Sequence, residues 1–257
     1  MDVIDFISGE RLKTYEVHTG TRKKAIALHN HTLQLGSSLL SMIALLELAL
    51  RNSTNLHLSA DFDDSDWLLP GHTNVPLRKR EIATVGKARK QAQREAYSKL
   101  SYQDKISLDT QAFPAGIPSG YKHNKVVKAR QSLFNPSHGQ IISQTTFSLW
   151  KRLYSSEYHD TLWKRSLKKI FPNKSLHRGQ ISRALEVIYA TRNRVAHHEP
   201  IYAERLCETM DALSFLLDTF GARTKNDETG FKKFSRVHYL RLRMDHAAFL
   251  EAWETLC

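Results

Sequence analysis

The sequence predicts an all-α fold, and three features of the chain support that class. Apolar residues recur at intervals of three and four along most of its length, with almost no strand-like alternation. Phosphate-binding loops of the GxxxxGKS/T or GxGxxG type do not occur in the sequence, so the nucleotide-binding α/β classes lose support. The 257 residues include 41% hydrophobic residues, 11 Gly and 7 Pro, which is enough to bury a core. We expect one domain over residues 1–257, a helical bundle with a basic helical insertion at 75–135.

The first predicted helix covers residues 22–57. Residues 25–46 contain no Asp, Glu, Lys or Arg, and this length would suffice for a membrane span. Polar side chains nevertheless fill its first half and charged side chains close its second: His29, Asn30, His31, Thr32, Gln34, Glu47 and Arg51. We therefore interpret the segment as a buried core helix, and we expect no membrane partner.

Two basic helices are predicted next, at 78–100 and 122–134. The stretch between them holds two Pro and two Gly residues and is expected to be a loop, and the second helix should stop at Asn135-Pro136. The cations of the first helix are spread around it, so it cannot be fully buried: Arg78, Lys79, Arg80, Lys87, Arg89, Lys90 and Arg94.

Positive charge is concentrated in this insertion. The chain has 38 Lys and Arg against 26 Asp and Glu, a formal charge of +12 that favours an anionic partner. Residues 1–74 hold 6 cations against 9 acids, residues 75–135 hold 13 against 4, and residues 136–257 hold 19 against 13. The insertion is either a solvated surface excursion or an arm whose seven cations, named above, bind RNA phosphates.

Further helices are predicted at 140–154, 157–170, 178–199, 201–222 and 232–255. The two cysteines, Cys207 and Cys257, form no CxxC pair, and the N-terminus is not of the secretory type. A reducing cytoplasm is therefore the expected location.

The helix at 178–199 carries the residues of greatest chemical interest. Pro200 disfavours helical geometry for Glu199 and should end the helix there. Four polar side chains then occupy its last two turns: Arg192, Asn193, His197 and His198. Because Asn193 and His197 are four residues apart, they should lie one above the other on the helix surface.

This helix end suits acid-base chemistry on RNA. Carbonyl groups at a helix C-terminus stabilise an imidazolium by a few tenths to about 1 kcal/mol. RNA cleavage requires that the 2′-hydroxyl lose a proton, that the 5′-oxygen gain one, and that a cation stabilise the phosphorane. We predict His197 as general acid and base, with His198 as its support or substitute, Arg192 as the cation and Asn193 as the orienting residue. This scheme needs no metal and no cofactor.

Metal binding through His197, His198 and Glu199 is the competing chemistry. A zinc site of the HExxH type needs a second His one turn after the first, and here Pro200 breaks the helix and Tyr202 takes the place of that His. We therefore expect no metal site.

Glu47 and Arg51 lie one turn apart in the apolar helix, where charged side chains need partners. Two interpretations stay open. They form an internal pair that holds helix against helix, or Glu47 orients Arg192 or a histidine while Arg51 contacts RNA. His29, His31 and His57 are interpreted as packing or surface residues.

Four blocks of the sequence together form a family-like pattern. They are the motif Arg192-Asn193-Arg194-Val195-Ala196-His197 with its extension HHEPIY, the helix ending ALLELALRNSTNLHL with Glu47, Arg51 and Asn52, TFSLWKRLY at 146–154, and LWKRSLKKIFPN at 162–173. In these blocks the chain resembles the Abi-like (abortive infection) family of the HEPN ribonuclease superfamily. The insertion at 75–135 is its least family-like part.

The resemblance implies an HEPN-like bundle that forms a homodimer, in which Arg192 and His197 of both protomers face one composite cleft. It implies metal-independent cleavage of single-stranded RNA to 2′,3′-cyclic phosphate and 5′-hydroxyl ends, and a role as a toxin or abortive-infection antiviral effector. It also implies that a noncoding RNA or protein antitoxin can restrain the activity. The alternative is a noncatalytic RNA-binding protein of such a system; a DNA-binding regulator has less support, because no helix-turn-helix signal is visible.

Overall fold

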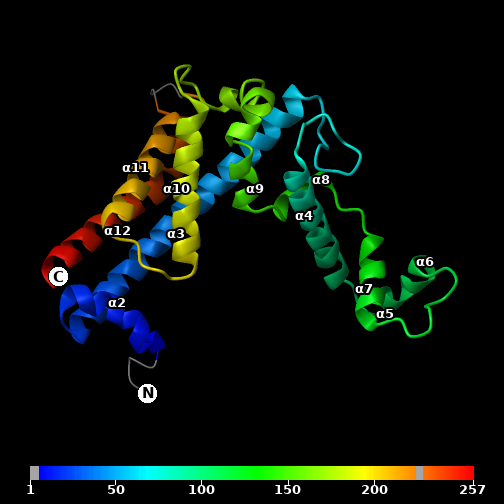
Figure 1. Cartoon of the computed structure of the whole chain (residues 1–257), viewed down its shortest axis with the longest axis horizontal. Helices are drawn as coiled ribbons and strands as arrows, with labels where there is room; N and C mark the ends of the chain where they lie inside the picture. The colour runs from blue at the N-terminus through cyan, green and yellow to red at the C-terminus, as the bar shows by residue number, and fades with distance from the viewer. Residues whose placement is uncertain (1–5, 224–227) are drawn as a thin grey trace.

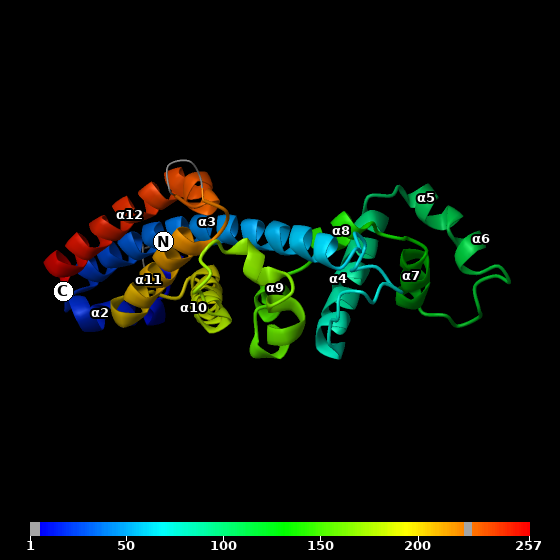
Figure 2. The same cartoon turned by 90° about the horizontal axis from the view of Figure 1, so that it is seen from above.

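The fold is built on one long helix. In the computed structural model, which describes residues 6–223 and 228–257, α3 (Arg22–Asp61) has 40 residues. At 1.5 Å per residue it is about 60 Å long. A body of helices surrounds its N-terminal part, and an arm lies beyond its C-terminal end (Figures 1 and 2). The described residues form helices and no strand apart from one isolated bridge, so the all-α prediction is confirmed.

The body helices bury their apolar faces on α3. The helices α2 (Gly9–Thr19), α10 (Arg178–Ala196) and α12 (Gly230–Leu256) contact α3 directly, and α11 (Ala203–Thr219) packs on α10 and α12. By length and composition alone α3 could cross a membrane. Its buried apolar side chains lie in the core cluster of the body, as expected for a core helix.

The N-terminal helix α2 is absent from the sequence prediction. Its apolar side chains are few, but Leu12 and Tyr15 lie three residues apart, on the same side of the helix, and are buried against the body. Gly20 ends the helix in the left-handed conformation (φ 69°), and its N–H donates to the carbonyl of Glu16. The C-terminal helices predicted at 201–222 and 232–255 are confirmed as α11 and α12.

The arm consists of α4 (Lys79–Ser98), α5 (Tyr102–Ser107), α6 (Asp109–Ala112) and α7 (His123–Ser132). The two predicted basic helices are confirmed as α4 and α7. The stretch between them is only partly a loop, contrary to prediction. Ser101 starts α5 by accepting a hydrogen bond from the Asp104 N–H at 3.1 Å, a local N-cap that the later Pro and Gly residues do not prevent.

Two predicted helices are wrong as continuous elements. The helix predicted at 140–154 is divided into α8 (His138–Ser143) and α9 (Phe147–Arg152). Between them, the Thr145 hydroxyl donates to the Ile142 carbonyl and accepts from Trp150 Nε1, which interrupts the helix. The helix predicted at 157–170 is replaced by three short helical turns: η1 (Ser156–Tyr158), η2 (His159–Trp163) and η3 (Leu167–Ile170). Here the rings of Tyr154, Trp163 and Phe171 contact one another, and this aromatic packing overrides the regular helical period.

Candidate functional site at the end of α10

The end of α10 differs from the prediction by three residues. The helix ends at Ala196, and His197 is its C-cap, with its N–H shared between the carbonyls of Asn193 (3.2 Å) and Arg194 (3.1 Å). His198 then takes a positive φ of 56°, and the Glu199 N–H returns to the Arg194 carbonyl at 2.9 Å. This left-handed turn closes the helix before Pro200 can act. The two histidines therefore follow the last turn instead of lying within it.

A close approach between helices holds this end against α3. A Cβ atom on Gly36 would lie 3.0 Å from Val195 Cγ1, tighter than ordinary van der Waals contact. A side chain larger than that of glycine would require Val195 to move by a few tenths of an ångström, so Gly36 favours this close approach of α10. Val195 itself is buried, so the last turn of α10 is fixed to the core.

Three of the four predicted catalytic residues, Arg192, Asn193 and His197, follow one another within six residues at the end of α10. Arg192 and His197 are exposed and Asn193 is half-buried. Arg192 Nη1 lies 3.5 Å from Asn193 Oδ1, at the outer limit of a hydrogen bond. Within residues 6–223 and 228–257, neither Arg192 nor His197 has an acidic partner. Their polar groups are thus available to an anionic ligand.

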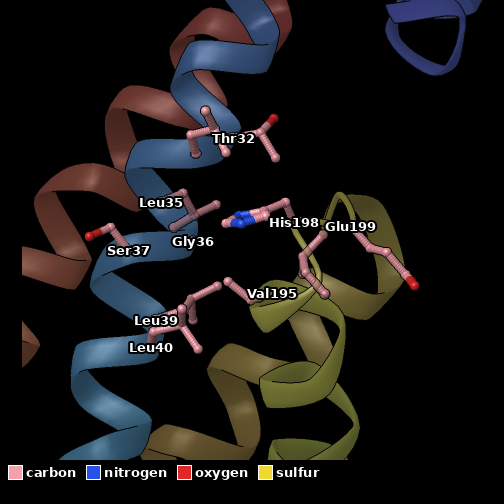
Figure 3. Close-up of a pocket in the computed structure, with 11 residues that line it drawn as sticks. Thr32, Leu35, Gly36, Ser37, Leu39, Leu40, Val195, His198 and Glu199 are labelled. Carbon is pink, nitrogen blue, oxygen red and sulfur yellow. The ribbon is translucent and has the colours of Figure 1, made fainter. Parts of the chain in front are cut away.

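His198 points to a different place. Its imidazole is directed at α3 near Gly36, whereas Glu199 points away (Figure 3). The cavity there measures about 250 Å3 and is lined mostly by apolar side chains of α3. Glu199 forms an ion pair with Arg194 at 3.1 Å. In the part of the chain that the structure describes, no group of three His, Cys, Asp or Glu side chains is arranged to hold a metal ion.

His29 is a neighbour of this site that the sequence analysis interpreted as a packing residue. It is 5% exposed, its ring meets Tyr15 edge-on at 5.4 Å, and its Nδ1 has no hydrogen-bond partner. Burial lowers the pKa of His29, and the charges of Arg11 and His198 lower it further. The structure therefore brings a second, buried imidazole near His198. In the sequence, the position of His29 within residues 25–46, which contain no Asp, Glu, Lys or Arg, indicated that its side chain could be buried.

Glu47 and Arg51 contact each other. Arg51 Nη2 lies 3.3 Å from Glu47 Oε1, and both side chains are mostly buried. Glu47 is eleven residues, or about 16 Å, along α3 from the Gly36 contact with α10. Among the described residues, no hydrogen bond or ion pair joins Glu47 to Arg192 or to a histidine.

The seven predicted RNA-binding cations fall into different surroundings. Arg78 forms an ion pair with Glu157 at 3.4 Å, and Arg89 lies 3.5 Å from Asn135. Lys79, Arg80 and Lys87 are exposed along α4. Lys90 and Arg94 alone among the seven line a cleft between α4 and α7.

This cleft, which we call the basic cleft, has a volume of about 700 Å3. Its lining comes from both helices: Lys90, Gln93, Arg94, His123, Asn124, Val127, Lys128, Gln131 and Ser132. No Asp or Glu is among these residues. The contributions of His123 and Lys128 were missed in the sequence analysis, although the basic character of their helix was recognised.

No family model, curated protein or solved structure matches this chain.

The end of α10 and the basic cleft lie far apart. Val195 meets α3 at Gly36, and α3 continues for 25 residues to Asp61, about 37 Å further along its axis. The arm lies beyond that point in both views of the molecule (Figures 1 and 2). One small ligand cannot touch both sites of a single chain.

Proposed function

We propose that this protein is a metal-independent endoribonuclease with an HEPN-like helical bundle. The observation that supports the proposal is the exposure of Arg192 and His197 on either side of the half-buried Asn193 in the sequence at the end of α10, where neither the cation nor the imidazole is neutralised by a described carboxylate. The substrate is single-stranded RNA, and the products carry 2′,3′-cyclic phosphate and 5′-hydroxyl ends.

In the proposed reaction, His197 accepts the proton of the 2′-hydroxyl as its oxygen attacks the adjacent phosphorus. Arg192 stabilises the extra negative charge on the phosphorane through its planar guanidinium, and Asn193 orients the phosphate. The bond from phosphorus to the 5′-oxygen breaks, and that oxygen takes a proton from a second imidazole. The partner subunit's His197 would supply this proton, since the imidazole of His198 is directed at α3.

A homodimer would complete the site. Arg192 and His197 are exposed to solvent in the single chain. A second copy would exclude water from this surface, and the lower dielectric constant would strengthen the interaction of Arg192 with phosphate. We propose further that the enzyme acts in the cytoplasm as a toxin or abortive-infection effector, restrained by a noncoding RNA or a protein antitoxin.

The test is incubation of the purified protein with end-labelled single-stranded RNA, with and without EDTA. Cleavage should persist in EDTA, and the new ends should be 5′-hydroxyl and 2′,3′-cyclic phosphate. His197→Ala and Arg192→Ala should each lower the rate by about 100-fold or more. Arg183→Ala is the matched control, since Arg183 is exposed on the same helix and should leave the rate unchanged. Full cleavage by His197→Ala, or strict dependence on a metal ion, would contradict the proposal.

A noncatalytic RNA-binding protein is the second candidate. The observation that favours it is the contrast between the exposed residues at the end of α10 and the basic cleft of the arm, with its volume of about 700 Å3. RNA binding without products, and without sensitivity to Arg192 or His197, would establish this alternative.

A further inference from the structure

The basic cleft presents positive charge that nothing described in the protein neutralises. Lys90 and Lys128 have no ion-pair partner among residues 6–223 and 228–257, and Arg94 donates through Nε to the neutral amide of Gln91 at 3.0 Å. Elsewhere in the arm, Arg130 is paired with Asp109. Several unpaired cations around one concave site repel one another and destabilise the folded protein. The same cations favour the binding of an anion there. The charge distribution therefore indicates a ligand site.

The walls of the cleft are held in place by contacts that leave its cations free. Gln93 Nε2 donates to the Phe134 carbonyl at 2.9 Å, which ties α4 to the segment after α7. Arg130 binds Asp109 through two hydrogen bonds of 2.7 and 2.6 Å, and its Nη1 lies 3.4 Å from the Tyr97 hydroxyl. Because these groups fix α7 against α4, the cleft exists before any ligand binds, which lowers the entropy lost on binding.

We propose that the basic cleft binds the backbone of single-stranded RNA, as a second site remote from the end of α10. Phosphates match Lys90, Arg94 and Lys128, while the amides of Asn124 and Gln131 can bond to sugars or bases. A volume of about 700 Å3 lies in the range of pockets that enclose small organic groups, so it accommodates a few nucleotide units. A duplex is contacted along its outer surface and does not enter a cleft of this size.

The separation of the two sites sets a length requirement. About 37 Å of α3 lies between the level of the α10 end and the start of the arm. A strand with the stacked spacing of ~3.4 Å per nucleotide needs more than ten nucleotides to bridge it. Only longer RNAs can occupy the cleft and the α10 end together. This step rests on the proposed nuclease function, whereas binding in the cleft does not.

The binding test uses the full chain with His197→Ala, so that RNA stays intact, and a fluorescent 20-nucleotide oligouridylate in an anisotropy titration at several salt concentrations. The double variant Lys90→Gln/Arg94→Gln should weaken binding at least about fivefold and lower the salt slope by about 1.4, and Lys128→Gln should lower the slope by about 0.7. The charge-matched control is Lys13→Gln/Arg183→Gln, exposed on α2 and α10, which should change affinity less than about twofold.

Three binding results would overturn the proposal. They are an equal loss in the control, no effect of Lys128→Gln on correctly folded protein, and binding of a 20-base-pair RNA duplex as tight as that of the single strand. Circular dichroism of each variant verifies that it is folded.

The cleavage test compares 4- and 30-nucleotide substrates with the His197-containing protein. Lys90→Gln/Arg94→Gln should lower kcat/KM at least about fivefold for the long RNA and leave the short one unchanged. Equal losses for both lengths would show that the cleft is not remote. Absence of cleavage with every RNA, combined with the expected binding results, would refute the nuclease function and leave the cleft assignment intact.

Discussion

The end of α10 and the basic cleft solve two different problems. At the end of α10, the groups that we propose for catalysis are few, and the close approach of Val195 to Gly36 holds the last turn of that helix on the core. In the cleft, the groups are many and positively charged, and they lie on an arm with few buried side chains. Chemistry requires positions fixed to a fraction of an ångström, whereas binding through phosphates tolerates a softer support. The comparison suggests that affinity and turnover can be altered independently.

The arm is attached to the body through Glu81, a carboxylate that is 1% exposed. It accepts hydrogen bonds from Tyr158 Oη at 2.6 Å and Arg152 Nε at 3.1 Å. Burial opposes its ionisation, but these bonds outweigh burial and hold the pKa of Glu81 below its ordinary value. The Tyr158 hydroxyl also accepts from the Arg78 N–H at 2.9 Å. This small network therefore fixes the first turn of α4.

The largest effect on stability should come from Glu81→Ala, by about 2 to 4 kcal/mol, because it leaves a partly buried Arg152 without this partner. Hydrogen exchange should show faster opening of α4 than of α10, together with a lower urea midpoint. Arg78→Ala, which removes an exposed pair with Glu157, is the control and should cost less than about 1 kcal/mol. Equal acceleration of exchange in α10 would mean that arm and body unfold as one unit.

Two glycines give a matched pair for the two regions. Gly36→Ala places a Cβ 3.0 Å from Val195 Cγ1 and should destabilise the body by about 1 to 2 kcal/mol, since the buried Val195 must move. Gly86→Ala on α4 meets nothing within 4 Å and should stabilise by about 0.5 to 1 kcal/mol through helix propensity. Thermal unfolding measures both changes.

The same pair separates turnover from binding. Gly36→Ala should also displace the α10 end and reduce RNA cleavage without changing oligouridylate affinity. Loss of affinity with retained cleavage would reverse the roles assigned to the two regions.

A third, smaller effect concerns acid stability of the body. Asp245 is 6% exposed and accepts hydrogen bonds from Ser38, from Gln34 at 2.9 Å and from Arg241 at 2.9 Å. Burial opposes its ionisation, but these bonds hold its pKa below the ordinary value. A carboxyl whose pKa is lower in the folded than in the unfolded chain contributes stability above the unfolded pKa of about 3.9, and loses it as the pH falls through the folded value.

Urea titrations between pH 6 and pH 2.5 test this contribution. Asp245→Asn should be less stable at pH 6 by about 1 kcal/mol and should lose less stability than the wild type on acidification. Parallel pH profiles of the two proteins would show that Asp245 is not linked to folding. Ser182→Ala on α10, whose hydroxyl takes no part in this cluster, serves as the control.

The parts of the fold that could be predicted are determined by residues close together in the sequence. The parts that could not be predicted are determined by contacts between residues far apart in the sequence. The helices at 22–57 and 122–134 follow from local periodicity, since each buries or exposes a consistent face. The predicted helix at 157–170 fails because the contacts of Trp163 with Tyr154 and Phe171 decide its geometry, and these are tertiary. Local propensity is a weak guide wherever large aromatic rings must share one core.

The candidate sites show the same division. Arg192, Asn193 and His197 were predicted together from their spacing, because all three fall within six residues of the chain. The basic cleft could not be identified in this way, since Lys90 and Lys128 come together only when α4 packs on α7. The end of α10 at Ala196 was also beyond local inference: Pro200 marks a helix stop, but the left-handed His198 turn acts first.

The smallest predicted effect uses two histidines, His29, which is buried in the body, and His138, which is half-buried in α8 next to α4. Burial lowers the pKa of His29 in the body, where Arg11 and His198 are nearby. Burial also lowers the pKa of His138 at the base of the arm, against the opposing charges of Asp66 and Asp64. Below about pH 6.5 both histidines are protonated in the unfolded chain but bind protons more weakly in the folded chain, so the free energy of unfolding falls as the pH is lowered.

The two histidines can be separated by local measurement. Between pH 7.5 and pH 5.5, the loss of stability should be less than about 1 kcal/mol for each histidine. In hydrogen exchange, His29→Gln should remove the pH dependence of α3 near the α10 end and leave that of α8 unchanged, and His138→Gln should do the reverse. His138 Nε2 is bonded to Asn55 Oδ1 at 2.8 Å, a bond that the Gln amide can replace, so its variant should stay folded. If either variant removed the pH dependence of both segments, the α10 end and the arm would be coupled through α3, and binding in the cleft would then affect the geometry of Arg192 and His197.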